Sequence, residues 1–297
     1  MGGYGVVVAT WRTTLLDTVA GRLERLEQLD AFSQPAQDAV RAAIPNGSVV
    51  KDVAVGSWFG HPVHPALTDV VVGSWLGGFA LDLLGGAKRE QAADDLVALG
   101  VLAAVPTAVT GLADWADVGE NERRVGTVHA LANVAALALQ VASWRARHRS
   151  NRAAGVGLTA GAIALSTAAA WLGGHLSFGR GVGVDETAFE APPTTWTVVN
   201  DDDKLEKGEL VRRSARGTGV VLVRYRGRVH ALLDRCNHRG CSLSEGEFDG
   251  TAITCPCHGS RFALDGSLLR GPAAYPQPVL ETRVHEGKIE VRARWAG

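Results

Sequence analysis

The sequence has almost no excess of charge and few cysteines, and both shortages limit what the protein can be. Its 297 residues carry 30 Lys and Arg against 31 Asp and Glu, a formal net charge of −1. No basic surface is predicted, so nucleic acid is not an expected partner. The 4 cysteines all lie within residues 236–257. A disulfide scaffold spreads its cysteines through the fold, whereas a short cluster that also holds histidine indicates a metal site.

The N-terminus lacks the pattern of an export signal, because residues 1–14 have no basic segment and only a short apolar run. We expect residues 1–60 to form an amphipathic helical segment. Pro35 and Pro45 are predicted to interrupt it. Within 11–32, apolar residues recur at helical spacing, at Leu16, Val19, Leu23, Leu26 and Leu29.

Residues 61–180 contain four apolar segments, at about 66–86, 93–115, 126–144 and 154–174. Each has close to the ~20 residues that cross a hydrocarbon core. Their interiors hold no Lys or Arg and are rich in Gly, Ala and Thr, which suits close packing of membrane helices. A soluble bundle with an Ala-rich core is the alternative. Four successive segments of this length favour an all-α transmembrane bundle in contact with lipid.

The loops between these segments differ in charge. We call the end where the first apolar helix begins side A and the opposite end side B. Loops 87–92 and 145–153 lie at side B and carry Lys and Arg, whereas loop 116–125 at side A is acidic. The positive-inside rule then makes side B cytoplasmic. We therefore expect a multi-pass protein of the cell membrane with everything after residue 175 on the outer face.

Residues 181–195, rich in Gly, Pro and Thr, are a predicted linker to a domain at 196–297. There the apolar period changes from that of helices to that of strands. Turns are expected at Arg226–Gly227 and Glu286–Gly287. The predicted domain is all-β, with small, barrel-like antiparallel sheets. The strands are expected at Val220–Arg224, Val229–Leu233, Thr251–Thr254, Pro278–Val284 and Lys288–Ala293.

The cysteine segment contains two short ligand patterns, Cys236-x-His238 and Cys255-x-x-His258. Two loops that each give one thiolate and one imidazole can hold a [2Fe–2S] cluster, with sulfur on one iron and nitrogen on the other. A Cys₂His₂ zinc site is the alternative, but zinc fingers place their cysteine pair and histidine pair in separate halves. Neutral imidazoles reduce the negative charge of the site, which raises the reduction potential.

These patterns, with the Gly271-Pro272 turn that follows, resemble the Rieske [2Fe–2S] family over residues 196–295. The resemblance implies that Cys236, His238, Cys255 and His258 hold the cluster. It also implies a disulfide between Cys241 and Cys257; two free buried thiols are the alternative. Ser260 matches a residue whose hydroxyl donates to the cluster in high-potential members.

Phe262 stands where those high-potential members have tyrosine with a second hydroxyl. One hydrogen bond that would stabilise the more negative reduced form is therefore missing. We predict a potential below that of respiratory Rieske proteins and above that of plant-type ferredoxins.

Several ionisable side chains are expected at side A of the membrane domain. The His61-Pro-Val-His64-Pro65 opening and the Gly-His175-Leu closing segment resemble a family of bacterial four-helix membrane domains, domain of unknown function 2231. Three interpretations stay open: binding of haem b, binding of a quinone or a metal, and hydrogen bonding at the interface. The candidate residues are His61, His64, His129, His175, Asp69 and Asp114.

The function expected from these features is that of a membrane-anchored iron–sulfur protein. It would carry single electrons between a redox partner protein and the membrane domain or the quinone pool. A redox sensor or assembly factor is the alternative. A stand-alone oxygenase is not expected, because it needs a further iron site in a large domain and only His285 follows His258 as a histidine. The protein is expected to be one component of an oxidoreductase system.

Overall fold

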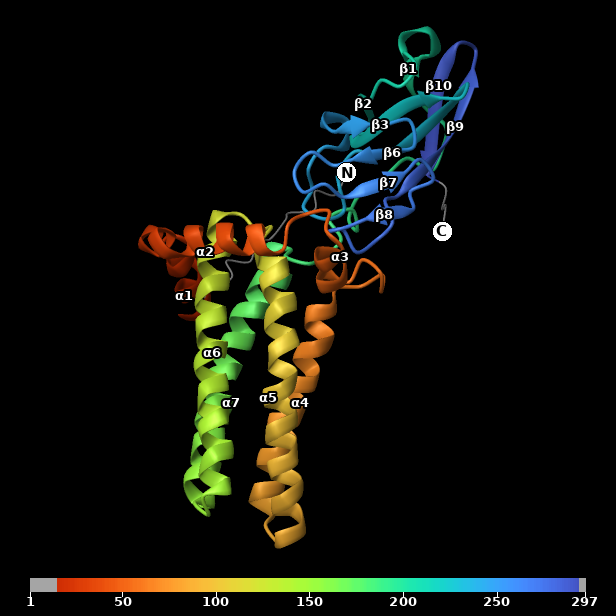
Figure 1. The fold of residues 1–297 in the computed structure, drawn as a ribbon. Helices are drawn as coiled ribbons and strands as arrows, with labels where there is room; N and C mark the ends of the chain where they lie inside the picture. The colour runs from red at the N-terminus through yellow and green to blue at the C-terminus, as the bar shows by residue number, and fades with distance from the viewer. Residues whose placement is uncertain (1–14, 294–297) are drawn as a thin grey trace, which may run out of the picture.

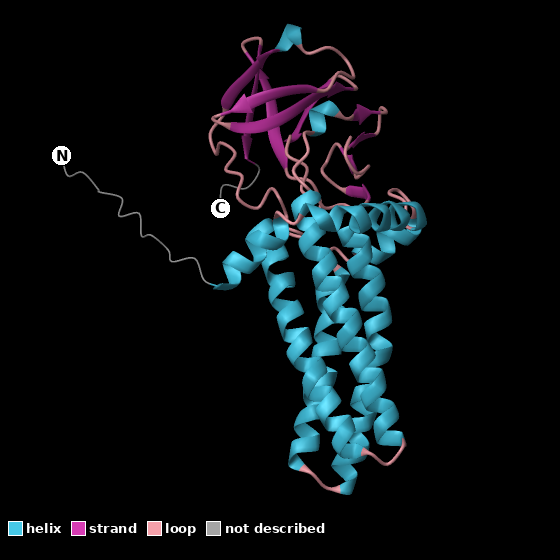
Figure 2. Cartoon of the chain, turned by 90° about the vertical axis from the view of Figure 1, so that its left-hand side faces the viewer, coloured by secondary structure: helices cyan, strands magenta, loops and turns pink. Residues whose placement is uncertain are grey.

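The computed structural model describes residues 15–293 and places the helices and the strands in two separate halves (Figures 1 and 2). The N-terminal part is not one helix. It forms α1 (Leu15–Glu24), a 3₁₀ turn (Glu27–Leu29), α2 (Asp30–Ala43) and α3 (Val49–Val55). Residues 11–14 of the predicted helix lie outside the described residues.

Pro35 lies inside α2 and does not end it, contrary to the prediction. Its fixed φ suits a helix, and near the helix start it removes a single backbone hydrogen bond. The seven-residue helix α3 was not predicted separately. Ser48 caps it by accepting a hydrogen bond from the Lys51 N–H (3.1 Å), and Gly56 ends it in a left-handed conformation.

Four long helices stand side by side below these short ones (Figure 1). All four are long and apolar enough to span a membrane. The four helices are α4 (Val63–Leu84), α5 (Ala87–Trp115), α6 (Glu120–His148) and α7 (Arg152–Gly174). Three of them, α5, α6 and α7, begin before the predicted segments, because charged residues in their first turns are helical too, whereas α4 is shifted toward the N-terminus. A π-helical turn, His175–Gly179, follows the last of them.

The four helices form two hairpins that bury equivalent positions. The most extensive helix contacts are α4 with α5 and α6 with α7. Three buried residues of α4 are separated from three buried residues of α6 by the same number of positions in the chain. Three buried residues of α5 are related to three of α7 in the same way. The pairs are Val71 and Ala136, Trp75 and Gln140, Gly78 and Ser143 for the first helices, and Ala93 and Gly155, Val97 and Thr159, Gly100 and Ala162 for the second.

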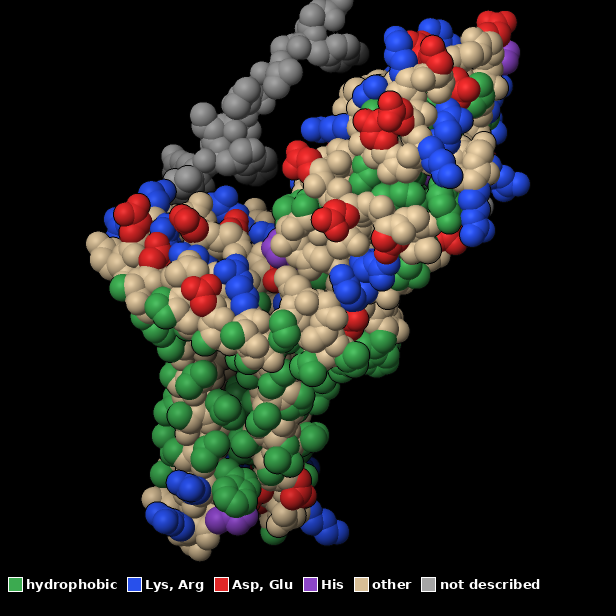
Figure 3. Space-filling view, turned by 45° about the horizontal axis from the view of Figure 1, so that its top comes forward, with side chains coloured by type: hydrophobic (Ala, Val, Ile, Leu, Met, Phe, Trp, Pro, Cys, Tyr) green, Lys and Arg blue, Asp and Glu red, His purple; other side chains and the backbone are tan. Residues whose placement is uncertain are grey.

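A buried ion-pair network joins the hairpins at side B, far from the β domain. The Arg147 guanidinium on α6 contacts Asp82 on α4 (2.5 Å) and Asp94 on α5 (2.9 Å). Arg152 at the start of α7 also reaches Asp82 (2.5 Å). Burying these charges costs less because each is paired. In Figure 3, hydrophobic side chains cover the shaft of the bundle and charged ones gather at its ends.

The β domain consists of two antiparallel sheets, ordered β1-β10-β9-β4-β3-β2 and β5-β6-β7-β8. The two predicted hairpins are confirmed, since β3 pairs with β4 and β9 with β10. All five predicted strands are present; β1, β2, β5, β7 and β8 were not predicted. The strands are β1 (Thr197–Asp201), β2 (Val211–Ala215), β3 (Thr218–Tyr225), β4 (Arg228–Leu233), β5 (Glu247–Phe248), β6 (Ala252–Thr254), β7 (Arg261–Ala263), β8 (Leu268–Arg270), β9 (Val279–His285) and β10 (Lys288–Ala293).

Candidate metal centre

The four predicted ligands lie on two loops that face each other. Cys236 and His238 follow β4, and Cys255 and His258 follow β6. Both thiols are buried, at 1% and 2% exposure, and stand outside any disulfide. The two imidazole rings meet edge to face with centroids 4.9 Å apart. The fold therefore brings all four side chains into one place.

The unsatisfied atoms of this site fit a bound cluster. The Nδ1 atoms of His238 and His258 are buried and have no hydrogen-bond partner among the described residues. A buried nitrogen without a partner is costly unless it binds something. Burial lowers the pKa of His238 to about 3 and also lowers the pKa of His258, so both rings are held neutral. Neutral imidazole is the form that binds metal.

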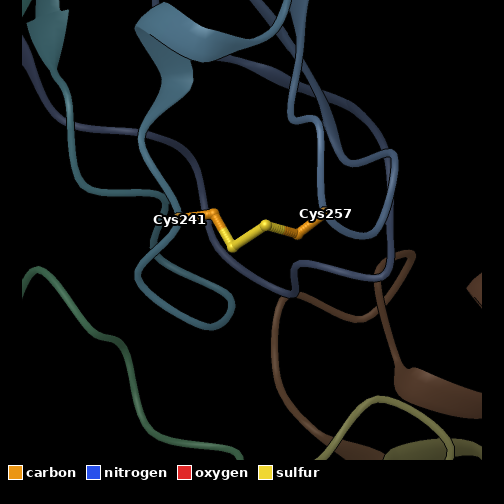
Figure 4. The surroundings of a disulfide bond; sticks show 2 residues. All are labelled: Cys241 and Cys257. Atoms are coloured by element: carbon orange, nitrogen blue, oxygen red, sulfur yellow. A yellow bond between two sulfur atoms is a disulfide. The ribbon is translucent and has the colours of Figure 1, made fainter.

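A disulfide connects the two ligand loops, as the resemblance implied. Cys241 and Cys257 are bonded, and Figure 4 shows the bond running from one loop to the other. Cys241 comes three residues after His238, and Cys257 immediately precedes His258. The crosslink therefore fixes the separation of the two imidazoles.

Ser260 and Phe262 lie beside the ligands in the β domain. Ser260 is fully buried, and its Oγ accepts a hydrogen bond from the Ala273 N–H (3.0 Å). The hydroxyl hydrogen of Ser260 is left to be donated elsewhere, which suits the predicted bond to the cluster. Phe262 is fully buried in the apolar cluster that includes Cys236 and Cys255.

Two buried amides that sequence reasoning missed hold a loop over the ligands. This loop, residues 271–278, is called here the proline loop. Asn237 Nδ2 donates to the carbonyls of Tyr275 (2.8 Å) and Pro276 (2.9 Å). Gln277 Nε2 donates to the carbonyls of Leu233 (2.8 Å) and Arg235 (2.7 Å). The position of Asn237 between Cys236 and His238 was the available signal.

The proline loop also contacts the membrane domain. Asp52 of α3 accepts a hydrogen bond from the Gly271 N–H (3.0 Å), and the Ser57 hydroxyl donates to the Ala273 carbonyl (2.8 Å). His61 meets Tyr275 with its ring edge to face, at a centroid distance of 5.4 Å. The β domain thus rests on the bundle by its ligand-bearing end, and His61 faces the β domain.

His64 and His129 occupy equivalent places in the two hairpins. The His64 Nδ1 bonds the Thr107 carbonyl of α5 (2.9 Å), and the His129 Nδ1 bonds the Ala169 carbonyl of α7 (2.8 Å). Each ring packs where a side chain at a glycine would collide, Gly111 for His64 and Gly173 for His129. Each imidazole therefore ties the two helices of its hairpin together. Asn133 Nδ2 lies 3.2 Å from the Nε2 of His129.

His175 lies apart from the other membrane histidines. Its Nε2 is 2.8 Å from the Glu24 carboxylate, which also pairs with Arg180. Burial opposes ionisation of Glu24, but the hydrogen bonds from Arg180 and His175 outweigh it and lower the pKa of that carboxyl. His175 thus fastens α1 to the end of the bundle.

The two predicted aspartates join none of these histidines. Asp69 is exposed on α4, and Asp114 is partly buried in the last turn of α5. Over residues 15–293, no three His, Cys, Asp or Glu side chains are placed to hold one metal ion. The structure therefore separates the membrane candidates and does not gather them into one site. Each iron of the expected cluster needs only two protein ligands, so the β-domain site is unaffected by this finding.

Comparison with known protein families now defines the class. The model of the Rieske [2Fe-2S] domain matches residues 195–282, and that of a family of predicted membrane proteins, DUF2231, matches residues 60–186. The chain belongs to the Rieske proteins, whose domain is defined by a [2Fe–2S] cluster. In particular, it is a Rieske domain fused to a DUF2231 membrane domain.

Its relatives include a ferredoxin and an iron–sulfur subunit of a cytochrome b6-f complex. Ferredoxin CarAc of Metapseudomonas resinovorans is 34% identical over 98 residues, covering 32% of this chain and 92% of the ferredoxin. The cytochrome b6-f complex iron-sulfur subunit 3 of a Nostoc species is 43% identical over 58 residues, covering 20% of this chain. The chain spans only 32% of that subunit's length.

Among solved structures, the ferredoxin of carbazole 1,9a-dioxygenase from Nocardioides aromaticivorans IC177 is similar to this chain. The match covers 34% of this chain and 99% of the ferredoxin, with 27% identity and a TM-score of 0.32.

Proposed function

We propose that this protein carries single electrons between a redox partner protein and its own membrane domain or the quinone pool. One observation carries the proposal. The ligand-bearing end of the β domain rests on the membrane domain, where the Nε2 of His238 lies 3.7 Å from the Asp117 carboxylate. Its ferredoxin and b6-f relatives favour electron transfer over other uses of a cluster.

The bound cluster supplies the one-electron redox change. The residues of the chain supply ligation and placement. Cys236 and Cys255 would hold one iron, and His238 and His258 the other. The Ser260 hydroxyl would donate to the cluster, and the proline loop would lie over the ligands, held by Asn237 and Gln277. The contacts of Asp52 and Ser57 keep this end of the β domain at side A of the bundle.

Stopped-flow oxidation of the reduced, full-length protein tests the proposal. We expect a water-soluble quinone analogue or a soluble cytochrome to oxidise the cluster at enzymatic rates, about 1–10³ s⁻¹. The His148→Ala variant is the matched control, since it changes an exposed histidine at the side-B end of α6, outside the cluster site and outside the candidate membrane site. Oxidation far slower than this range by every carrier tried would instead favour the sensor or assembly role.

The outer-face location of the β domain is part of the proposal and rests on the loop charges. Cys257 is exposed, so it can report the side once the disulfide is reduced. In intact cells, a membrane-impermeant maleimide should label Cys257 after mild reduction and not before. Labelling that requires the membrane to be opened would place the β domain on the inner face.

Haem b is a second candidate cofactor, for the pair His64 and His129. The observation in its favour is that the two rings occupy equivalent places on α4 and α6, each bonded through Nδ1 to a carbonyl of its own hairpin. Nε2 would then be the ligand atom of each ring, and a haem would have to displace the Asn133 amide, which lies 3.2 Å from the Nε2 of His129. A visible spectrum of the reduced protein tests this: the bands of a six-coordinate haem support it, and Rieske absorbance alone contradicts it.

A further inference from the structure

A buried lysine lies beneath the ligand-bearing end of the β domain. Lys51 belongs to α3, and its side chain is 0% exposed. Its ammonium donates to the Ala113 carbonyl of α5 (2.5 Å) and lies 2.9 Å from the Asp117 carboxylate. Burial of an ammonium is costly, so the paired carboxylate is needed to hold it there.

Asp117 faces two positive or potentially positive groups. Its side chain is 3% exposed, and Oδ1 accepts a hydrogen bond from Asn46 (3.3 Å). Its Oδ2 lies between two groups, 2.9 Å from the Lys51 ammonium and 3.7 Å from the Nε2 of His238. The Nδ1 atom of that ring is the one left for iron, so Asp117 acts on the far side of a ligand.

Both charges act on both imidazole ligands. Lys51 and Asp117 are electrostatic partners of His238 and of His258, together with Arg239, and Arg41 acts on His258 as well. Lys51 comes from the N-terminal segment and Asp117 from the membrane domain, so neither belongs to the β domain. Because they are buried, salt and water screen their fields weakly.

We propose that the Lys51–Asp117 pair, which joins the N-terminal segment to the membrane domain, sets the redox potential of the cluster in the β domain. An added electron is repelled by the Asp117 carboxylate and attracted by the Lys51 ammonium. The inference rests on the proposed function only in requiring a redox-active cluster. In this proposal the two residues act on the cluster through the electric field that they produce at its histidine ligands. The redox site then includes residues outside the β domain.

Redox titration of the full-length protein, followed by electron paramagnetic resonance at one neutral pH, tests the proposal. Asp117→Asn removes the negative charge with little change of shape and should raise the midpoint potential. Lys51→Met removes the positive charge and should lower it. We expect each to change the ratio of reduced to oxidised cluster about tenfold at the wild-type midpoint, which is about 59 mV for one electron. The double variant should return toward the wild-type value.

Opposite signs separate an electrostatic role from a structural one. If the pair only held α3 in place, both single variants would loosen the same contact and shift the potential in the same direction. Lys51→Arg is a second variant for the case in which Lys51→Met folds poorly. It keeps the positive charge and should therefore retain the wild-type potential. Asp95→Asn is the matched control, because Asp95 is exposed near the side-B end of α5 and its removal should leave the potential unchanged.

Shifts of the same sign, or no shift, with an intact cluster signal would overturn the inference alone. Absence of a cluster signal in the wild-type protein would instead overturn the proposed function.

Discussion

The partly buried histidines of the β domain and those of the helical bundle differ in the bonding of one ring nitrogen, Nδ1. In His238 and His258 this atom is buried and has no partner within residues 15–293, whereas in His64 and His129 it bonds a helix carbonyl. All four rings are largely removed from water. Burial therefore does not identify a ligand. The unsatisfied nitrogen does, because a protein rarely leaves such an atom unpaired without a use for it.

The largest effect on the cluster should come from removing one of its histidine ligands, compared with removing a histidine of the bundle. His258→Ala removes one of two nitrogen ligands, so the cluster should be lost and the iron content should fall to near zero. His64→Ala should retain full iron content. Iron analysis and the electron paramagnetic resonance spectrum of both purified variants measure this. Cluster loss in His64→Ala as well would show that the free nitrogen does not separate the two classes.

The disulfide should matter to the β domain and not to the bundle. Replacing Cys241 and Cys257 together by serine removes a crosslink that closes a loop of 16 positions. The expected loss of stability is about 3 kcal/mol. Thermal unfolding followed by cluster absorbance should begin at a lower temperature, while helical circular dichroism of the bundle melts as before. An unchanged cluster melt would mean that the paired amides of Asn237 and Gln277 already hold the loops.

Replacing a bundle histidine should have a smaller effect, on the stability of the bundle and not on the cluster. His129→Leu removes the hydrogen bond to the Ala169 carbonyl and the packing of the imidazole ring beside Gly173. We expect a loss of about 1–2 kcal/mol. Denaturation in detergent measures it, and the cluster spectrum should not change. His148→Leu, at the exposed end of α6, is the control and should be neutral.

The smallest effect should come from tuning an intact site. Phe262→Tyr offers a hydroxyl to the cluster side of the β domain and should raise the midpoint potential. A hydrogen bond to a charged group is worth about 1.5 kcal/mol, which is roughly tenfold in the redox ratio, or about 59 mV. Phe262→Leu carries no hydroxyl and serves as the control. An unchanged potential in the tyrosine variant would mean that the new hydroxyl bonds elsewhere.

The sequence predicted the two β hairpins and the four long helices, and it selected four candidate ligands that the fold brings together. These features are local, since a Cys-x-His spacing or an apolar run depends only on neighbours in the chain. The strands β5, β7 and β8 were missed because two or three residues carry no period. Lys51 was missed because no pattern marks a lysine for burial. Its place depends on Asp117, and the nearby contact of Asp52 with Gly271 joins residues that are distant in the sequence.

The two hairpins suggest a consequence for how such a bundle can arise. His64 and His129, like Trp75 and Gln140, occupy matching positions on helices that both run from side A to side B. Two copies of a single hairpin, related by an axis along the membrane normal, would bring the same positions together. A protein that contained only one such helical hairpin could therefore build a comparable core as a dimer. The opposite charges of Asp82 and Arg147, which also match in position, would have to diverge after duplication, since identical copies would place like charges in contact.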